Sequence, residues 1–232
     1  MANKPNANSA SIRAVIFDYG EVLCHSPASD ILDRLMQIFG IDLPRFEELY
    51  RKNRLRYDRG DLTAEEYWQH FAADAGVHLD SSQLPAVRQY DLEMWSSINP
   101  AMLAWLDDLR STGIKTAILS NMPSEMVQHV RKTFPWIEQF DCRVFSADLR
   151  RVKPEPEIYQ HCLDCLHVAP SEALFIDDKQ VNVEGARELG IRGIRMESVP
   201  QLTNELKAIG FTPLPRAAEL GEIQCHSSSG NS

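Results

Sequence analysis

The 232-residue sequence predicts an α/β fold in which helices flank a parallel β-sheet and a helical domain is inserted after the first strand. Two observations predict it. Short apolar runs alternate with helical patterns in the second half of the chain, and such connections make the strands parallel. The interval from 26 to 97, in contrast, contains helical patterns and no convincing strand.

Five compact runs of apolar and β-branched residues are predicted to be strands. They are IRAVIFD (12–18), KTAILSN (115–121), CRVFSA (142–147), ALFIDD (173–178) and RGIRM (192–196). Helical patterns separate the later runs, and Gly113 and Gly190 are expected to end two of these helices. Three strands end in polar residues, and ligands of parallel sheets bind at the carboxyl ends of the strands. The functional site is therefore expected at that edge.

Four helical runs fill the interval after the first strand. They are ASDILDRLMQIFG, LPRFEELYRKNRLRYDRG, TAEEYWQHFAADAG and QLPAVRQYDLEMWSS. Thr63 and Glu66 have the spacing of a capping box, which predicts the start of the third helix. The predicted organisation is a disordered tail (1–11), a core domain (12–25 and 98–214), a helical domain (26–97) and a C-terminal tail (215–232).

Composition limits the classes of partner. A formal net charge of -9 and a pI near 5.3 argue against a nucleic-acid backbone, which needs basic patches. No run of about 18 apolar residues could span a membrane, and the first residues lack the apolar segment of a secretory signal. A cytoplasmic monomer or small homo-oligomer that acts on a small molecule is expected.

The cysteines are odd in number and scattered, which favours free thiols in a reducing compartment. They are Cys24, Cys142, Cys162, Cys165 and Cys225. Cys162 and Cys165 form a C-x-x-C flanked by His161 and His167, so a metal site was weighed against a helical face of small hydrophobic residues. No second C-x-x-C completes a zinc set, and the helical interpretation is favoured.

Carboxylates end two of the predicted strands. Asp18 follows the first apolar run, and Asp177 and Asp178 follow the fourth. Carboxylates that converge repel one another unless a cation neutralises them, and hard oxygen ligands suit Mg²⁺. The same edge is expected to receive a hydroxyl, an amide and an ammonium group, from Ser120, Asn121 and Lys153. The sequence therefore predicts a magnesium site beside a nucleophile.

These residues form four motifs, which are Asp18, Ser120–Asn121, Lys153 and Asp177–Asp178. Their order and spacing resemble those of the haloacid-dehalogenase-like hydrolase superfamily, whose members are mostly phosphatases. Within it the sequence is similar to the branch with a helical cap inserted after the first motif. Closer still are the phosphatase-like domain of soluble epoxide hydrolase and bacterial sugar-phosphate phosphatases. The resemblance covers the chain apart from its tails. It implies a Rossmann-like core, a helical cap and Mg²⁺-dependent hydrolysis of small phosphate monoesters, sugar phosphates above all.

The resemblance also implies roles for individual residues. Asp18 is expected to be the nucleophile that forms an aspartyl-phosphate. Mg²⁺ is expected to bind Asp18, the carbonyl of Gly20 and Asp178. The phosphoryl oxygens are expected to contact Ser120, Asn121 and Lys153, while the supporting contacts come from Asp177 and Asn182.

Gly20 departs from the family pattern, because most family phosphatases carry a second aspartate there as general acid and base. Glu21, His25, water or a hydroxyl of the substrate are the alternatives for this role. Two other functions stay open. One is a 2-haloacid dehalogenase with the same Asp18 nucleophile, against which the Asp177–Asp178 pair argues, and the other is a catalytically weak protein that binds phosphometabolites.

The helical domain is expected to determine substrate specificity. Its basic and aromatic candidates for substrate contact are Arg54, Arg56, Tyr57, Arg59, Trp68 and Trp95. Basic residues on helices are usually solvated and tryptophans usually belong to the core, so each candidate has a structural alternative.

Overall fold

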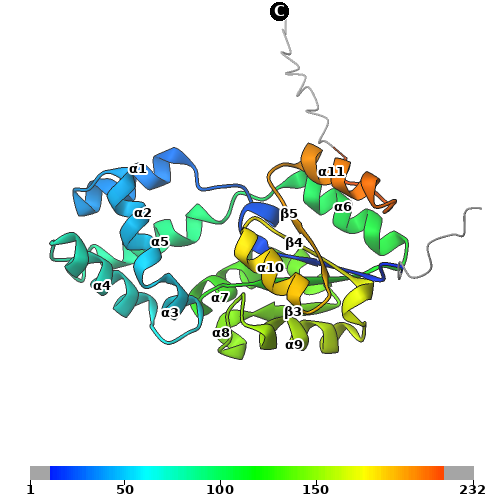
Figure 1. The fold of residues 1–232 in the computed structure, drawn as a ribbon. Coiled ribbons are helices and arrows are strands. Elements are labelled where there is room, and N and C mark those ends of the chain that lie inside the picture. The colour runs from blue at the N-terminus through cyan, green and yellow to red at the C-terminus, as the bar shows by residue number, and fades with distance from the viewer. Residues whose placement is uncertain (1–10, 217–232) are drawn as a thin grey trace, which may run out of the picture.

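A five-stranded parallel β-sheet forms the centre of the larger part of the molecule (Figure 1). The computed structural model describes residues 11–216. The strands, in the order β3-β2-β1-β4-β5, are β1 (Ala14–Phe17), β2 (Lys115–Ser120), β3 (Cys142–Phe145), β4 (Ala173–Asp177) and β5 (Arg192–Arg195). The predicted α/β fold class is confirmed, and each strand ends one or two residues earlier than the sequence predicts.

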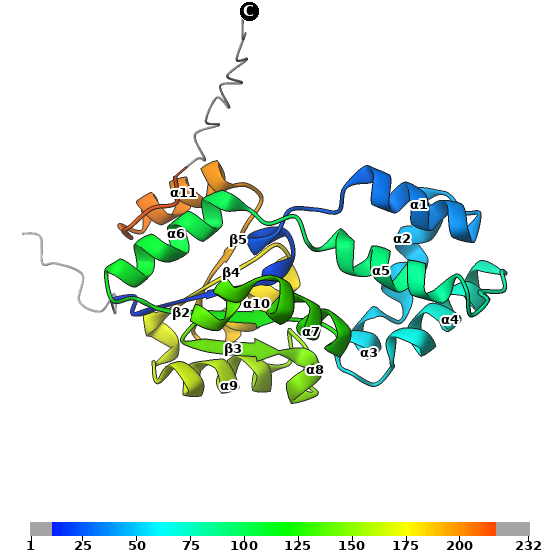
Figure 2. The same cartoon turned by 180° about the vertical axis from the view of Figure 1, so that it is seen from behind.

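Helices cover both faces of the sheet (Figure 2). One face packs against α6 (Pro100–Ser111), α7 (Ser124–Thr133) and α11 (Val199–Ala208), and the other against α9 (Pro156–Leu166) and α10 (Gln180–Glu188). Shorter helical turns are a π turn at Tyr19–Leu23, 3-10 turns at Pro135–Gln139 and Pro170–Glu172, and α8 (Ser146–Leu149). Every residue of β1 and β4 is buried, as expected for parallel strands covered on both faces.

A second group of helices, here called the helical unit, has an apolar core of its own. It consists of α1 (Ser29–Phe39), α2 (Leu43–Lys52), α3 (Arg54–Asp58), α4 (Ala64–Ala75) and α5 (Leu84–Met94). The predicted helical run from 43 to 60 is divided at Asn53, where ψ is 8°. Gly40 and Gly76 end α1 and α4 with positive φ angles of 61° and 76°, which glycine adopts without strain.

Two adjacent chain segments connect the helical unit to the sheet. Cys24 forms an antiparallel bridge with Ile98, and the backbone N–H of His25 donates to the Ser97 carbonyl at 2.7 Å. Because the first segment follows β1 directly, the helical unit lies beside the carboxyl ends of the strands (Figure 1). Ion pairs between Arg59 and Glu155 and between Arg88 and Glu125 hold the two parts together.

One disulfide corrects the expectation that all the thiols are free. Cys142, the first residue of β3, is bonded to Cys165 in the last turn of α9, with Cα atoms 6.0 Å apart. Packing of α9 on the sheet brings together residues that are 23 positions apart. Cys24 and Cys162 are free and buried, and Cys225 lies outside the described residues. The cysteines therefore do not support the inference of a reducing compartment.

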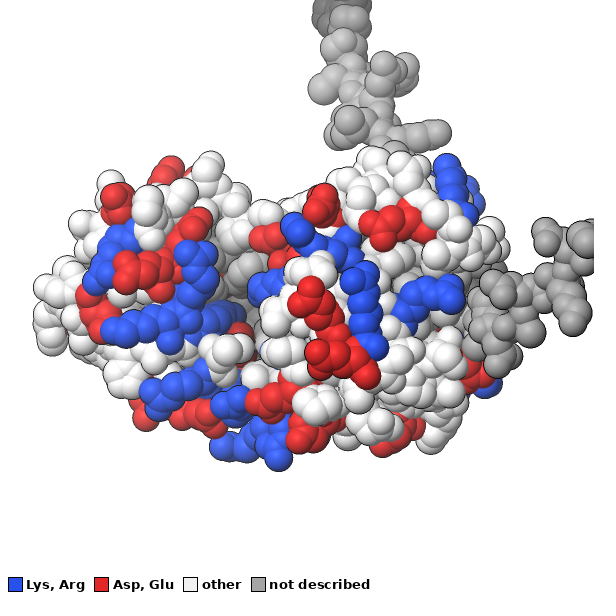
Figure 3. Space-filling model, viewed as in Figure 1, with Lys and Arg blue, Asp and Glu red and all other residues white. Residues whose placement is uncertain are grey.

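No helix within residues 11–216 is long and apolar enough to cross a membrane. Acidic and basic side chains are interspersed over both parts of the face drawn in Figure 3. Apart from residues 11, 215 and 216, the predicted tails lie outside the described part of the chain.

Thr63→Ala tests the start of α4. The Thr63 hydroxyl accepts from the Glu66 N–H at 3.2 Å, and the Glu66 carboxylate accepts from the Thr63 N–H at 2.8 Å, so the predicted capping box is confirmed. We expect the alanine variant to lose about 1 kcal/mol of unfolding free energy in urea denaturation, because one helix cap is lost. Thr63→Ser keeps the hydroxyl and should stay near wild type; an equal loss in both variants would contradict this account.

Candidate active site

Asp18, Ser120 and Asp177 lie beside one another because their strands are neighbours. β1 lies between β2 and β4, with Asp18 directly after β1 and the other two residues at the ends of β2 and β4. All three are buried. The chain runs from β1 to β2 and β3 on one side and then crosses to β4 on the other, so this group lies where the strand order reverses. Ligands of open α/β sheets bind at such a point.

A tight turn after β1 holds Asp18 at the edge of the sheet. The N–H of Asp18 donates to the Ile176 carbonyl at 2.9 Å, so its backbone is still paired with β4. Its Oδ1 atom accepts from the Tyr19 N–H at 2.7 Å. Glu21, two residues on, has a left-handed φ of 57°, which turns the chain away. The carboxylate of Asp18 is thereby fixed while its second oxygen is left for other contacts.

Gly20 leaves room for an aromatic ring from the helical unit. Its φ of -63° and ψ of 131° are open to any residue, so backbone freedom does not explain the glycine. A Cβ atom at this position would lie 3.4 Å from the ring of Trp95. That ring is fixed, because the Tyr19 hydroxyl donates to the Trp95 carbonyl at 2.8 Å and the indole N–H donates to the Tyr50 hydroxyl at 3.2 Å. A side chain at position 20 would therefore pack against the ring of Trp95.

Lys153 joins two of the aspartates. It is 1% exposed, and its Nζ atom lies 2.9 Å from Asp18 Oδ1 and 2.6 Å from Asp177 Oδ2. Burial alone would lower the pKa of Lys153, but the carboxylates of Asp177 and Asp18 outweigh it and raise the pKa. Burial likewise acts to raise the pKa of Asp18, yet Lys153 and Lys179 hold it below its ordinary value. Asp18 is therefore a carboxylate, the form that a nucleophile requires.

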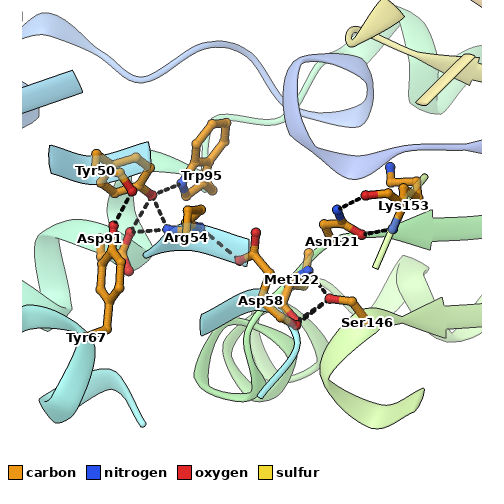
Figure 4. Close-up of polar contacts among 10 residues, drawn as sticks. All are labelled: Tyr50, Arg54, Asp58, Tyr67, Asp91, Trp95, Asn121, Met122, Ser146 and Lys153. Carbon is orange, nitrogen blue, oxygen red and sulfur yellow. Dashed lines mark hydrogen bonds and ion pairs between the residues drawn. The ribbon is translucent and has the colours of Figure 1, made fainter. Parts of the chain in front are cut away.

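Asn121 holds the loop that carries Lys153 (Figure 4). Its side-chain amide donates to the Lys153 carbonyl at 3.0 Å, and its Oδ1 atom accepts from the Lys153 N–H at 2.7 Å. An amide has two hydrogens, so one remains for a ligand. The Ser120 hydroxyl helps to lower the pKa of Asp18. Asn121 thus fixes the backbone of Lys153, and one of its amide hydrogens is left for the expected contact with a phosphoryl oxygen.

Asp177 has contacts on both oxygens. Oδ1 accepts from the Lys179 N–H at 2.8 Å, and Oδ2 accepts from Lys153. The side-chain amide of Asn182 lies 3.0 and 3.1 Å from the two oxygens. These contacts agree with a role for Asp177 and Asn182 in holding Lys153. Both oxygens of Asp177 are occupied, so neither is readily available to bind a metal ion.

Asp178 has a different environment from its neighbour. It is half-buried, and burial together with the charge of Asp18 raises its pKa to about 7. One carboxylate oxygen from each of Asp18, Asp177 and Asp178 lies within 4.8 Å of the other two. Because Asp177 is already bound on both oxygens, Asp18 and Asp178 are the carboxylates that fit a hard divalent cation such as Mg²⁺.

A cavity of about 240 Å³ lies between this group and the helical unit. The sheet side contributes Asp18, Ser120, Asn121, Lys153, Asp178 and Lys179, and the helical side contributes Tyr50, Arg54, Asp58 and Trp95. A larger cavity of about 520 Å³ lies at the opposite ends of the strands, and none of its lining residues is an acid. The smaller cavity is therefore the candidate active site.

The helical side of the cavity carries a buried polar network centred on Arg54 (Figure 4). Arg54 Nε donates to Asp58 Oδ1 at 2.8 Å, and its Nη1 atom lies 3.4 Å from Asp91 Oδ1 and close to the Tyr50 hydroxyl. Tyr50 donates to Asp91 at 2.9 Å. Two carboxylates thus face one guanidinium, so Arg54 is not an unpaired cation waiting for an anionic ligand.

Four of the basic and aromatic candidates do not line the cavity, namely Arg56, Tyr57, Arg59 and Trp68. Arg56 is exposed on α3, and Trp68 is fully buried in the core of the helical unit. Of the six candidates for substrate contact, Arg54 and Trp95 face the site.

Glu21 and His25, the two side chains considered as general acid and base in place of a residue at position 20, lie in different places. Glu21 lines the candidate site but also a second cavity on the surface, and its side chain acts on the pKa of Asp178. His25 lines only that second cavity. The structure therefore does not bring His25 to the nucleophile.

Sequence reasoning missed three charged residues that line the cavity, namely Arg51, Asp58 and Lys179. Asp58 follows Arg54 by four positions, a spacing that pairs side chains on a helix and could have indicated the ion pair. Lys179 directly follows Asp177 and Asp178, and it lowers the pKa of both Asp18 and Asp58.

Known proteins share sequence with this chain. Over 201 residues it is 28% identical to (S)-2-haloacid dehalogenase 4A of Burkholderia cepacia, which covers 80% of the chain and 83% of that protein. Over 113 residues, 49% of the chain, it is 34% identical to Bifunctional epoxide hydrolase 2 of Mus musculus. Over 220 residues, 90% of the chain, it is 28% identical to Acyl-CoA dehydrogenase family member 10 of Mus musculus. These alignments span only 18% and 20% of the two mouse proteins.

The fold has counterparts among solved structures. A HAD family enzyme from Bacteroides thetaiotaomicron, in complex with magnesium and inorganic phosphate, superposes with a TM-score of 0.66. The match covers 81% of this chain and 95% of that chain at 24% identity, which shows a common fold. The family model for haloacid dehalogenase-like hydrolases matches residues 12–190. Since this span is most of the chain and contains the strand edge with its aspartates, the protein belongs to the haloacid dehalogenase-like hydrolase family.

Proposed function

We propose that the protein is a Mg²⁺-dependent hydrolase of small phosphate monoesters that works through a phosphorylated Asp18. The observation that supports this most is the charge balance at the sheet edge. The buried ammonium of Lys153 binds Asp18 and Asp177 but not Asp178, whose pKa is raised to about 7. A divalent cation between Asp18 and Asp178 would relieve the repulsion between these carboxylates.

In the first step an oxygen of Asp18 attacks the phosphorus, and the bond from phosphorus to the leaving oxygen breaks. Lys153 lies 2.9 Å from the attacking carboxylate and offsets the negative charge of the phosphoryl group. Ser120 and the remaining amide hydrogen of Asn121 are placed to donate to the phosphoryl oxygens. In the second step water attacks the phosphorus, the bond to Asp18 breaks and inorganic phosphate leaves.

The metal would be held by Asp18, Asp178 and the carbonyl of Gly20, with Asp177 and Asn182 as supporting residues. When bound, Mg²⁺ supplies positive charge to the phosphoryl oxygens and orients them for in-line attack. Asp177 keeps Lys153 in place through its 2.6 Å contact, and Asn182 keeps Asp177 in place.

The substrate is a small, hydroxylated phosphate ester, with sugar phosphates as the leading class. A cavity of about 240 Å³ limits the size of the leaving group. Its helical side offers the carboxyl group of Asp58, which suits hydrogen bonding to a sugar hydroxyl. A cytoplasmic location and a monomeric or small homo-oligomeric state remain predictions of the sequence.

A second candidate is 2-haloacid dehalogenation, which the similarity to the Burkholderia dehalogenase favours. Asp18 would then attack carbon and displace halide. Such a reaction has no use for a cation at Asp178, and Arg54, one of the two arginines that line the cavity from the helical unit, is already paired with Asp58 and Asp91. Phosphate ester hydrolysis therefore accounts for more of the site.

Asp18→Asn tests covalent catalysis. An amide has nearly the same shape as a carboxylate but cannot act as the nucleophile, so we expect turnover of p-nitrophenyl phosphate to disappear while the circular dichroism spectrum is unchanged. Wild-type protein should require Mg²⁺ for this turnover. Chloride release from 2-chloropropionate without metal would favour the dehalogenase instead.

Asp178→Asn tests the metal position. We expect the Mg²⁺ concentration for half-maximal activity to rise about tenfold or more, because one of two charged ligands is lost. The exposed Asp33→Asn on α1 is the matched control and should leave the titration unchanged. If the Asp178 variant keeps the wild-type Mg²⁺ dependence, the metal lies elsewhere.

Gly20→Asp tests whether Trp95 fills the position of the missing aspartate. Because the Cβ atom alone would contact the Trp95 ring at 3.4 Å, we expect the added carboxylate to displace the ring, raise KM and leave kcat no higher. Tryptophan fluorescence would report the displacement. An increase in kcat without a change in KM would mean that position 20 accepts a general acid readily.

A further inference from the structure

The proposed reaction lacks a proton donor for the leaving group. When the bond from phosphorus to an alkyl oxygen breaks, that oxygen needs a proton, and a general acid contributes about 10² to 10⁴ in rate. Gly20 has no side chain to supply it, and Trp95 fills the adjacent space. Lys153 is unsuited, because the two carboxylates that it binds raise its pKa. Neither position 20 nor Lys153 therefore supplies the proton, and the other titratable side chains that line the cavity are the candidates.

Asp58 enters the cavity from the helical side. It is the last residue of α3, and its carbonyl accepts a hydrogen bond from Ser146. The Ser146 hydroxyl in turn accepts from the Met122 N–H at 2.8 Å, in the segment that follows Ser120 (Figure 4). Asp58 is thus anchored to the segment that carries part of the phosphate site, and it lines the same cavity as Asp18.

The two oxygens of Asp58 have different surroundings. Oδ1 accepts from Arg54 at 2.8 Å, whereas no hydrogen bond from residues 11–216 reaches Oδ2. The side chain is 7% exposed. Burial and the charge of Asp91 on α5 act to raise its pKa, Arg54 and Lys179 act to lower it, and the result is a pKa of about 6. Asp58 can therefore carry a proton close to neutral pH, unlike an ordinary aspartate.

Asp91 provides a contrast within the same network. Its Oδ1 atom accepts from Tyr50 at 2.9 Å and lies 3.4 Å from Arg54, and Asp91 does not line the cavity. A partner that only neutralises Arg54 needs no access to the substrate. Asp58 has that access, because it lines the same cavity as Asp18 and Lys179.

The geometry points to Asp58 as the general acid that protonates the leaving oxygen, an inference that rests on the proposed phosphatase function. As Asp18 bonds to phosphorus, the bond to the leaving oxygen breaks and the proton of Asp58 passes to that oxygen, which releases the alcohol. The Asp58 carboxylate then takes a proton from the water that attacks the aspartyl-phosphate. That step regenerates the Asp18 carboxylate and the Asp58 acid and releases inorganic phosphate.

Two substrates that differ in their need for a proton test this role. p-Nitrophenolate leaves readily without protonation, whereas the alkoxide of ethyl phosphate does not. We expect Asp58→Asn to lower kcat/KM for ethyl phosphate by about 100-fold or more, the contribution of a general acid, and for p-nitrophenyl phosphate by less than about tenfold. An equal loss for both substrates would show that Asp58 only holds Arg54, and would overturn the assignment.

Asp91→Asn is the matched control, because it removes the other carboxylate partner of Arg54 from outside the cavity. It should lower kcat/KM for ethyl phosphate far less than Asp58→Asn does, because Asp91 acts on the acid only through its charge; a selective loss as large as that of Asp58→Asn would overturn the assignment. Measurements on the wild type distinguish a failure of this inference from a failure of the proposed phosphatase function. If the wild type hydrolyses neither ester, the phosphatase proposal fails and this inference fails with it. If it hydrolyses both and Asp58→Asn leaves their ratio unchanged, only this inference fails.

Should Asp58→Asn not fold, the wild type alone decides the question through a series of substituted phenyl phosphates. With a general acid present, kcat/KM depends weakly on the pKa of the released phenol, because the proton offsets the charge on the leaving oxygen. A steep dependence would overturn the role of Asp58.

Discussion

The buried ammonium group of Lys153 is the interaction on which the site depends. Removing a charged lysine from water costs several kcal/mol, and only paired carboxylates make such burial tolerable. Asp18 and Asp177 supply them from two adjacent strands, and Asn121 binds the lysine's backbone from the end of a third. One cation thus ties together the ends of β1, β2 and β4, and the nucleophile is held in place by the same contacts that keep it ionised.

The sequence was sufficient to predict what local patterns and strand order determine. Apolar runs located all five strands, and the polar residues after them located the site, because parallel strands present their carboxyl ends at one edge. The capping pattern at Thr63 and the helix ends at Gly113 and Gly190, which both have positive φ angles, likewise depend on near neighbours in the chain. The family resemblance added candidate roles to residues that the pattern had already placed.

What the sequence could not supply depends on contacts between distant residues. Gly20 reads as a lost acid until Trp95, 75 positions away, is seen to fill its space. The disulfide depends on how α9 packs against the sheet, which no spacing of cysteines reveals. The hydrogen bond that Asn121 accepts from the Lys153 backbone, 32 residues away, is likewise absent from any local pattern, and its contact with phosphate stays a prediction. Asp58 was not predicted as a site residue, because its burial and its place in the cavity depend on how distant segments pack together.

The bridge between Cys24 and Ile98 has a consequence for the chain's conformational entropy. The two ends of the helical unit meet there, so residues 25–97 form a closed loop in the connection between β1 and β2. The entropic cost of closing a loop grows only with the logarithm of its length, about 0.6 kcal/mol for each doubling. A long insertion at this point therefore lowers the stability of the sheet little more than a short one does. The region that faces the substrate can lengthen, shorten or be exchanged while the register of β1 and β2, and with it the nucleophile, stays the same.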